Sequence, residues 1–238
     1  MLNTAEAARF LRVSQASIRR WSDSGQLPSR RVGGRRERRF KESDLAAFLD
    51  SQATTNSATG VVVGGIVVAA PAHLATFYST DTGLLRVTLP FLAEGLRLGE
   101  PCVLVATGGL LSRYVEALGR QDGVELERAQ DSGLFITAQF ADGTAAEAIA
   151  EWEQRLSQLI ARGARSIRIA GEMVSERAMF ASEDEMLRYE EAFELMSKRY
   201  PVVVICQYDV REFDGVAILR ALKAHPDMFD FRIGAFLN

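Results

Sequence analysis

The chain has 238 residues, of which 47% are hydrophobic and 25% are charged, as in ordinary globular proteins. It carries 28 basic and 31 acidic side chains, but residues 1–52 hold 11 of the basic and only 6 of the acidic ones. This basic first part favours a polyanionic partner, whereas the acidic remainder, residues 53–238, indicates a different role. The charge distribution therefore suggests two functional parts.

Two patterns argue against other classes of protein. Cys102 and Cys206 both lie in apolar runs, which is typical of buried reduced thiols and not of a disulfide or a metal site. The N-terminus has no basic segment followed by an apolar one, and the longest apolar run, residues 61–72, is too short to span a bilayer. We therefore expect a cytoplasmic protein with no membrane partner.

The first expected helix begins near Thr4, and Ser14 is a suitable N-cap for the second. On the second helix Ile18 and Trp21 share an apolar face. The side chains expected to point outward can bond base edges or phosphates, and they are Gln15, Ser17, Arg19 and Arg20. We interpret this helix as a DNA recognition helix, with a solvated surface helix as the alternative.

A hairpin and a further helix are expected next. Gly25 is placed to end the second helix as a C-cap. Gly33-Gly34 separates two arginine-rich segments, which predicts a hairpin with a glycine-rich tip. Ser43 is a suitable N-cap for the last helix of this part. The apolar residues of that helix are expected to close a small core, and they are Leu45, Phe48 and Leu49.

This order of elements resembles the winged helix-turn-helix of the MerR and excisionase-like superfamily. The resemblance rests on the pattern Ala-Ala-x-x-Leu-x-Val-Ser-x-x-Ser-Ile-x-x-Trp at residues 7–21. It continues through Gly25-x-Leu27-Pro28, Gly33-Gly34, Arg38-Arg39-Phe40 and Asp44-Leu45. Arg35-Arg36-Glu37 makes the expected wing tip longer than is usual there. The resemblance implies binding to double-stranded DNA.

Contacts with DNA are assigned by side-chain type. The candidates for base contacts are Gln15, Ser17 and Arg20, and those for phosphate contacts are Arg19, Arg30, Arg31, Arg35, Arg36 and Arg38. The alternative for some arginines, Arg39 above all, is pairing with Glu42 or Asp44. Because so small a domain covers few base pairs, we expect two copies on one DNA site, and therefore a homodimer.

Residues 53–60 are small, polar and aperiodic, so we expect a flexible linker between domains at residues 1–52 and 61–238. In the second domain short β-branched runs alternate with helical patterns, which predicts an α/β fold with a mostly parallel sheet. The expected strands are Val61–Ala69, Cys102–Thr107, Val124–Arg128, Leu134–Thr137, Ile167–Ala170 and Val202–Tyr208. The expected helices cover residues 82–96, 110–118, 145–161, 186–200 and 216–222, the last with Val216, Leu219 and Leu222 facing inward.

Catalysis is not expected in the second domain. The segment at residues 107–112 follows a strand but lacks the spacing and the lysine of a phosphate-binding loop, which argues against ATP hydrolysis. His73 and His225 are the only histidines, and the sequence places no convincing third metal ligand beside them. Glu172 ends an apolar run and faces a crevice, unless it pairs with Arg168 or Arg177. We therefore expect neither an enzyme nor a cofactor.

A second resemblance covers residues 61–238. The longer motifs that carry the resemblance are Pro90-Phe91-x-x-Glu94-Gly95-Leu96, Ile169-Ala170-Gly171-Glu172-Met173 and Cys206-Gln207-Tyr208-Asp209. The shorter ones are His73, Phe77-Tyr78, Gly99-Glu100 and Ala224-His225-Pro226. With these motifs, this part of the chain resembles the MEDS (DcmR-type sensory) family. The resemblance implies a RecA/KaiC-like three-layer α/β fold without a working phosphate loop, and the sensing of a small organic molecule.

In such a fold a ligand lies beyond the carboxyl ends of the strands. The candidates for binding it are His73, Tyr78, Glu172, Tyr208 and Asp209. The leading hypothesis is a one-component transcriptional regulator, in which the sensory domain controls the DNA-binding domain. The alternative is that the α/β domain only dimerises or recruits a protein partner, without a small ligand. A single pocket lined by these five residues would favour sensing, and five residues scattered over several places would count against it.

Overall fold

A computed structural model of the chain describes residues 1–11, 13, 15–23, 27–32, 37–48, 60–140, 144–231 and 233–238. The chain divides into two compact units, Met1–Gly60 and Val61–Asn238. None of the helices in the described ranges has the length and apolar composition needed to cross a bilayer. The predictions that fall outside these ranges concern Ser14, Gly25, Gly33, Gly34, Arg35, Arg36, Leu49 and residues 53–59.

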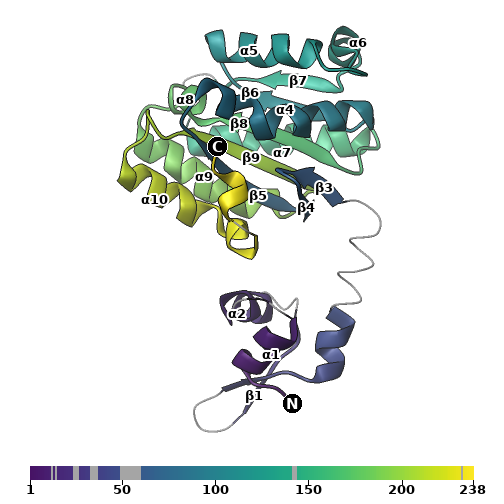
Figure 1. Cartoon of the computed structure of the whole chain (residues 1–238), viewed down its shortest axis with the longest axis vertical. Helices are drawn as coiled ribbons and strands as arrows, with labels where there is room; N and C mark the ends of the chain where they lie inside the picture. Colours follow the sequence, from purple (N-terminus) through teal and green to yellow (C-terminus); the bar gives the residue numbers. More distant parts are fainter. Residues whose placement is uncertain are drawn as a thin grey trace. The chain divides into compact units, whose positions relative to one another are not determined.

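The first unit contains short helices and one hairpin (Figure 1). Its elements are α1 (Thr4–Leu11), α2 (Gln15–Asp23), β1 (Arg30–Val32), β2 (Glu37–Arg39) and a helix at 42–48. At the start of α1 the Asn3 and Glu6 side chains each accept a hydrogen bond from the other residue's backbone N–H, at 2.9 and 2.8 Å. The buried core consists of Ala7, Ala8, Leu11, Ile18, Leu27, Phe40 and Leu45.

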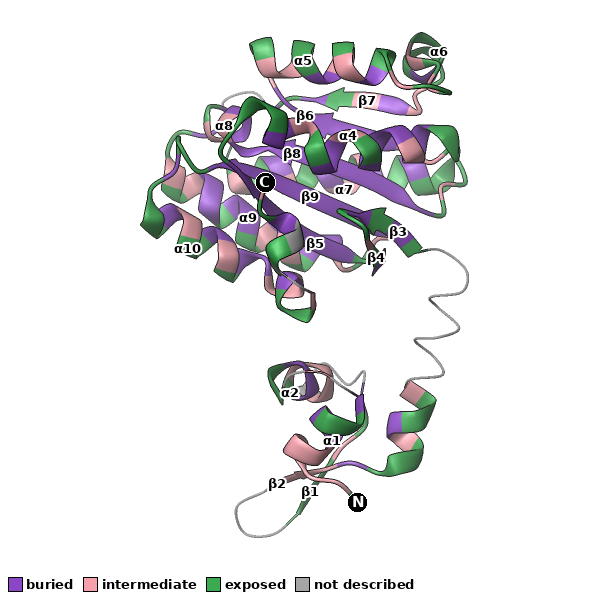
Figure 2. Cartoon of the chain, in the orientation of Figure 1, coloured by how far each residue is buried: buried purple, intermediate pink, exposed green. Residues whose placement is uncertain are grey.

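A five-stranded parallel sheet forms the centre of the second unit, in the order β5-β9-β8-β6-β7. Its strands are β5 (Ala72–Tyr78), β6 (Cys102–Val105), β7 (Phe135–Ala138), β8 (Ile167–Glu172) and β9 (Val202–Asp209). Strands β5, β6, β8 and β9 are buried along their whole length (Figure 2), as in sheets that are covered on both faces. The expected α/β fold with a parallel sheet is confirmed.

Helices cover the sheet on both sides (Figure 1). On one face lie α4 (Asp81–Arg97) and α5 (Gly108–Gly119), and on the other α7 (Ala145–Ala161) and α9 (Glu183–Ser197), with α10 (Gly215–Ala224) beside α9. The short helices are α6 (Leu126–Asp131), α8 (Met173–Arg177) and the 3-10 turns η1 (Pro226–Asp230) and η2 (Ile233–Phe236). Helix α7 has the predicted bounds, because its apolar residues recur with a regular helical period.

Three local predictions are wrong. Residues 61–69 form a separate hairpin of β3 (Gly60–Val63) and β4 (Ile66–Ala69), because Gly64 and Gly65 adopt φ values of 56° and 81° and turn the chain within two residues. No strand forms at 124–128, where the chain instead enters α6 at Leu126. Strand β5 was not expected, since its strand conformation depends on pairing with β9 along its whole length.

The orientation of α10 also differs from the prediction. Val216 and Leu219 are 66% and 53% exposed, although both were expected to face inward. The residues that α10 buries are small, namely Ala217, Ala221 and Ala224. Because alanine side chains are small, this face of the helix can lie close to the neighbouring elements. Close packing therefore decides which face of α10 is buried, and the hydrophobicity of the larger side chains does not.

A buried arginine organises the MEDS-like motif on α4. The guanidinium of Arg168 on β8 donates from Nη1 to the carbonyl of Phe91 at 2.7 Å, and from Nε to Glu100 Oε2 at 2.6 Å. It also pairs with Glu94 at 3.3 Å and lies 5.4 Å from the centre of the Phe91 ring. A Cβ on Gly95 would lie only 2.6 Å from Arg168 Cδ. The motif therefore builds a compartment for this arginine.

Candidate functional site

Three of the four α2 side chains assigned to DNA lie on the outer side of the helix. Gln15 and Arg19 are exposed and Arg20 is half-buried, whereas Ile18 is fully buried. Ser17 is only 5% exposed, so its expected outward orientation is wrong. Ser17 lies one helical turn before Trp21, whose ring packs 4.9 Å from that of Phe48, so both residues are on the inner side of the helix.

The hairpin of this unit concentrates positive charge. Four of the six residues of β1 and β2 are arginines, and Arg30 lies opposite Arg39 while Arg31 lies opposite Arg38. Arg39 pairs with Glu37 at 3.0 Å, and not with the expected Glu42 or Asp44. Like charges that face each other across two strands are unfavourable, and a bound polyanion offsets this cost. The hairpin therefore suits contact with a phosphate backbone.

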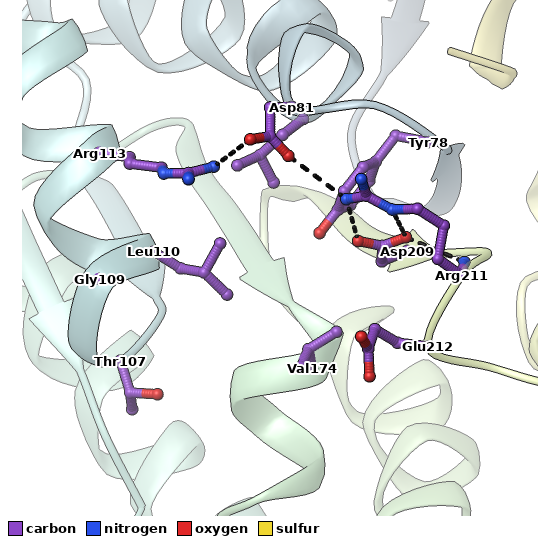
Figure 3. A pocket seen from close by; sticks show the side chains of 11 residues that line it. Tyr78, Asp81, Thr107, Gly109, Leu110, Arg113, Val174, Asp209, Arg211 and Glu212 are labelled. Carbon is purple, nitrogen blue, oxygen red and sulfur yellow. Dashed lines mark hydrogen bonds and ion pairs between the residues drawn. The ribbon is translucent and has the colours of Figure 1, made fainter.

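A cavity of about 470 Å³ lies at the carboxyl ends of the strands in the second unit (Figure 3). We call it the strand-end pocket. It is lined by Tyr78, Asp81, Leu84, Thr107, Gly109, Leu110, Arg113, Val174, Asp209, Arg211 and Glu212. These residues come from the ends of β5 and β9, from the turn after β9, and from the N-terminal parts of α4, α5 and α8. Among the described residues, no side chain caps the first turn of α5, whereas Thr80 caps α4 and Glu172 caps α8.

Two arginines and two carboxylates form a charged wall of the strand-end pocket. Arg113 pairs with Asp81 at 2.9 Å, and Arg211 bridges Asp209 at 2.6 Å and Asp81 at 3.4 Å. Arg113 holds the pKa of Asp81 below its usual value, and Arg211 does the same for Asp209. Both carboxylates are therefore ionised at neutral pH, so the wall offers paired donors and acceptors.

Tyr78 joins this pocket to the buried Glu172. The Tyr78 hydroxyl donates to Glu172 Oε1 at 3.1 Å, and burial, with the nearby charge of Glu172, raises the Tyr78 pKa far above its usual value. Glu172 also accepts from the backbone N–H groups of Val174 and Ser175 at 3.2 and 2.7 Å. Glu172 thus caps α8 and orients Tyr78, but it does not line the pocket and pairs with neither expected arginine.

The remaining two predicted residues, His73 and Tyr208, face the opposite side of the sheet. Tyr208 directly precedes Asp209 on β9, and consecutive strand residues point to opposite faces. His73 and Tyr208 lie beside α9 with Glu190 and Cys206. Burial lowers the pKa of His73 well below its usual value and raises those of Tyr208 and Cys206, so all three side chains are neutral.

The five ligand candidates therefore do not share one pocket, which counts against sensing by these five residues together. Tyr78 and Asp209 line the strand-end pocket, Glu172 lies behind Tyr78, and His73 and Tyr208 belong to a separate buried cluster. Three lining residues, Asp81, Arg113 and Arg211, were not predicted from the sequence. Arg211 follows the strand end at Asp209 by two residues, which was an available signal, whereas Arg113 reaches the pocket only because α5 packs beside α4.

Comparison with known proteins identifies both parts. Residues 1–53 match a helix-turn-helix domain, and residues 72–226, more than half of the chain, match the family described as MEDS, the methanogen/methylotroph, DcmR sensory domain. The chain belongs to the MEDS family. It is 34% identical over 245 residues to the transcriptional repressor DcmR of Methylorubrum extorquens (strain DSM 6343 / CIP 106787 / DM4), which covers 97% of this chain and 92% of that protein. This MEDS protein is a transcriptional regulator with a DNA-binding helix-turn-helix.

Solved structures resemble the MEDS protein in fold at low identity. The uncharacterized protein PH0321 from Pyrococcus horikoshii, in complex with an unknown peptide, has a TM-score of 0.50 and 13% identity over 68% of this chain and 77% of that chain. The KaiC-like protein PH0186 from Pyrococcus horikoshii OT3 has a TM-score of 0.45 and 15% identity. That match covers 58% of this chain and 61% of the KaiC-like chain.

Proposed function

We propose that this MEDS protein is a one-component, non-enzymatic regulator in which the strand-end pocket binds a small organic molecule. The observation that carries the proposal is the position of the pocket: Tyr78 and Asp209 end two adjacent parallel strands, and the first turn of α5, which no described side chain caps, lies beside them. Crevices at the carboxyl ends of parallel strands are the usual ligand sites of such folds.

The lining indicates the class of ligand. Leu84, Leu110 and Val174 supply apolar surface, and the Arg113–Asp81–Arg211 wall supplies charged donors and acceptors. A molecule with a short apolar part and one anionic or strongly polar group would satisfy both. Such a group would compete with Asp81 for the two guanidinium groups, because each is already held by a carboxylate.

Control of DNA binding requires a difference between two states of the protein. A ligand changes the DNA affinity only by the ratio of its own affinities for those states. We propose that Gln15, Arg19 and Arg20 on α2, and the arginines Arg30, Arg31 and Arg38 of the hairpin, contact DNA in a homodimer. The exposed face of α2 and the charge of the hairpin support this assignment.

The proposal is tested by screening small organic acids, alcohols and amides against the full-length protein in thermal-shift assays, followed by calorimetric titration. A compound that binds the pocket should raise Tm, because it binds the folded state and not the unfolded state. Its affinity should fall at least about tenfold in Arg113→Ala, the loss of roughly one charge-assisted hydrogen bond. Arg220→Ala is the matched control, because Arg220 pairs with Asp184 on the surface and does not line the pocket. An equal loss in both variants would contradict the assignment.

A second candidate function, dimerisation through the α/β unit, is favoured by one observation. Val216 and Leu219 lie one turn apart on α10 and both are more than half exposed. A second copy of the chain is the proposed occupant of this apolar face, because the small helix-turn-helix needs a partner copy to cover a DNA site of useful length.

A further inference from the structure

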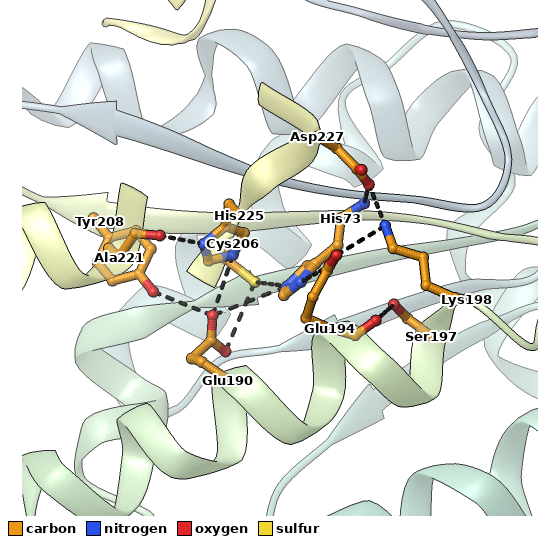
Figure 4. A network of polar contacts seen from close by, with 10 residues as sticks. All are labelled: His73, Glu190, Glu194, Ser197, Lys198, Cys206, Tyr208, Ala221, His225 and Asp227. Atoms are coloured by element: carbon orange, nitrogen blue, oxygen red, sulfur yellow. Dashed lines mark hydrogen bonds and ion pairs between the residues drawn. The ribbon is translucent and has the colours of Figure 1, made fainter. Parts of the chain in front are cut away.

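Four potential metal ligands converge in the core between the sheet and α9, away from the strand-end pocket (Figure 4). We call them the His–Cys–Glu cluster: His73 on β5, Glu190 on α9, Cys206 on β9 and His225 at the end of α10. All four are at least 97% buried, and their ligand atoms lie within 4.8 Å of one another. The chain has two histidines and two cysteines in total, and three of these four residues are in the cluster.

The distances within the cluster are within about 1 Å of those around a tetrahedral ion. His73 Nε2 lies 3.1 Å from Cys206 Sγ and 3.9 Å from Glu190 Oε2, and His225 Nε2 lies 3.2 Å from that same oxygen. Four ligands at zinc distances in tetrahedral geometry are separated by about 3.3–3.8 Å. Small side-chain adjustments would therefore place all four atoms around one ion.

Both imidazoles are already oriented as in metal sites. His225 Nδ1 lies 2.7 Å from the carbonyl oxygen of Ala221, and His73 Nδ1 lies 3.1 Å from Glu194 Oε2. Each Nδ1–H thus has an acceptor, which leaves each Nε2 lone pair directed into the cluster. Lys198 holds Glu194 in place at 3.2 Å.

One atom of the cluster has no hydrogen-bond partner among the described residues, and a buried carboxylate lies beside it. His225 Nε2 has no partner of hydrogen-bond geometry among the described residues, although it lies near Glu190. Glu190 is a carboxylate with 1% of its surface exposed, and it receives a hydrogen bond from Tyr208 at 3.2 Å. Buried carboxylates are normally paired with a cation or coordinate one.

We propose that His73, Glu190, Cys206 and His225 bind one divalent transition-metal ion of the zinc class. One thiolate, two imidazole nitrogens and one carboxylate oxygen form a mixed soft and borderline ligand set that suits zinc and does not suit magnesium or calcium. Binding releases the Cys206 thiol proton to solvent.

The site would tie distant segments of the α/β unit together. Its ligands come from the first and last thirds of the unit, and four protein ligands leave no open position, which is typical of structural and not of catalytic zinc. The ion would join β5 and β9 to α9 and to the end of α10. Its removal should therefore lower Tm without changing the strand-end pocket directly.

The experiment uses the full-length protein, stripped of metal with a chelator and titrated with Zn²⁺ and with Co²⁺. We expect one ion per chain by elemental analysis, a higher Tm with Zn²⁺, and thiolate-to-cobalt charge-transfer absorption with Co²⁺. Glu194→Ala should lower the metal affinity about 10–100-fold, because it removes the acceptor that orients His73.

The two cysteines provide matched variants. Cys206→Ser should abolish the charge-transfer absorption, whereas Cys102→Ser should retain it, since Cys102 is equally buried but lies by the carbonyls of Leu92 and Glu100. Wild-type protein that retains neither ion, or absorption that survives Cys206→Ser, would overturn the proposal. If Cys206→Ser does not fold, the wild-type cobalt spectrum and metal content decide between an ion and a purely hydrogen-bonded network.

Discussion

At the scale of single residues, Arg168 illustrates what a buried charge requires. Only 1% of its surface is exposed, and its guanidinium is paired with two carboxylates and a backbone carbonyl. Removing these partners would leave a buried charge without compensation. The free-energy cost of that charge is larger than the net stabilisation that the intact ion pair provides. The compartment also needs space, and Gly95 provides it by having no side chain.

Gly95→Ala should destabilise the protein by about 1–3 kcal/mol, because the new Cβ would lie 2.6 Å from both Arg168 Cδ and Cys102 Sγ. Urea unfolding followed by circular dichroism measures this free energy. Gly215→Ala is the control, since no described residue outside the start of α10 itself has an atom within 4 Å of the position its Cβ would occupy, and its stability should be unchanged or slightly higher. Equal stabilities of the two variants would show that the compartment tolerates a methyl group.

Asp209 should make the free energy of unfolding depend on pH. Its pKa lies below the usual 3.8 because Arg211 donates to it, so the stabilisation is present above that value and is lost as pH falls through the lowered pKa. Arg211 is half exposed, which limits the contribution to about 1 kcal/mol or less. The difference in unfolding free energy between wild type and Asp209→Asn should be constant from pH 7 to about 5 and shrink below pH 4. A difference that grows in acid would refute this.

At the scale of secondary-structure elements, α2 and the hairpin should contribute to DNA binding in different ways. Arg20→Ala on α2 should weaken binding to the specific site about 10–100-fold with little effect on random DNA. Arg30→Ala on β1 should weaken binding to all sequences and lower the slope of log affinity against log salt by about one. Fluorescence anisotropy at several salt concentrations separates the two, and identical profiles would contradict these roles.

Helix α10 provides a test of self-association. Val216→Asp should shift the protein from dimer to monomer in light scattering, because a carboxylate on the exposed apolar face cannot be buried without a partner. Leu98→Asp serves as the control, since Leu98 is 64% exposed at the end of α4 and on another part of the unit. A mass that is the same for wild type and for both variants would remove α10 from the interface.

At the scale of the whole molecule, the two units carry separate cores and opposite charge. Residues 61–238 produced alone should unfold in one cooperative transition, because their core lies wholly within that segment. The same fragment should have lost specific DNA binding, since every proposed DNA contact precedes residue 53. Calorimetry and anisotropy check the two outcomes, and DNA binding by the fragment would reverse the assignment of the units.

Much of the fold was predictable from local patterns. The parallel sheet and helix α7 follow from the regular spacing of apolar residues, and the helix-turn-helix follows from its motif. The failed predictions share a cause. The strand at β5, the buried face of α10 and the helical start of α6 depend on neighbouring elements, which local periodicity does not report. One error could have been avoided from the sequence. Consecutive strand residues point to opposite faces of a sheet, so Tyr208 and Asp209 could not have lined the same pocket.

The sequence by itself determined the division of charge, the order of the elements and membership of a family of regulators, since each is written in neighbouring residues. Only the tertiary structure decided which distant side chains meet. Parallel strands bring Tyr78 and Asp209 to one rim, and the packing of α9 brings Glu190 and His225 to His73 and Cys206. These contacts depend on strand order and helix packing. Local sequence periodicity does not report them, because the residues that meet across the sheet are more than a hundred positions apart in the chain.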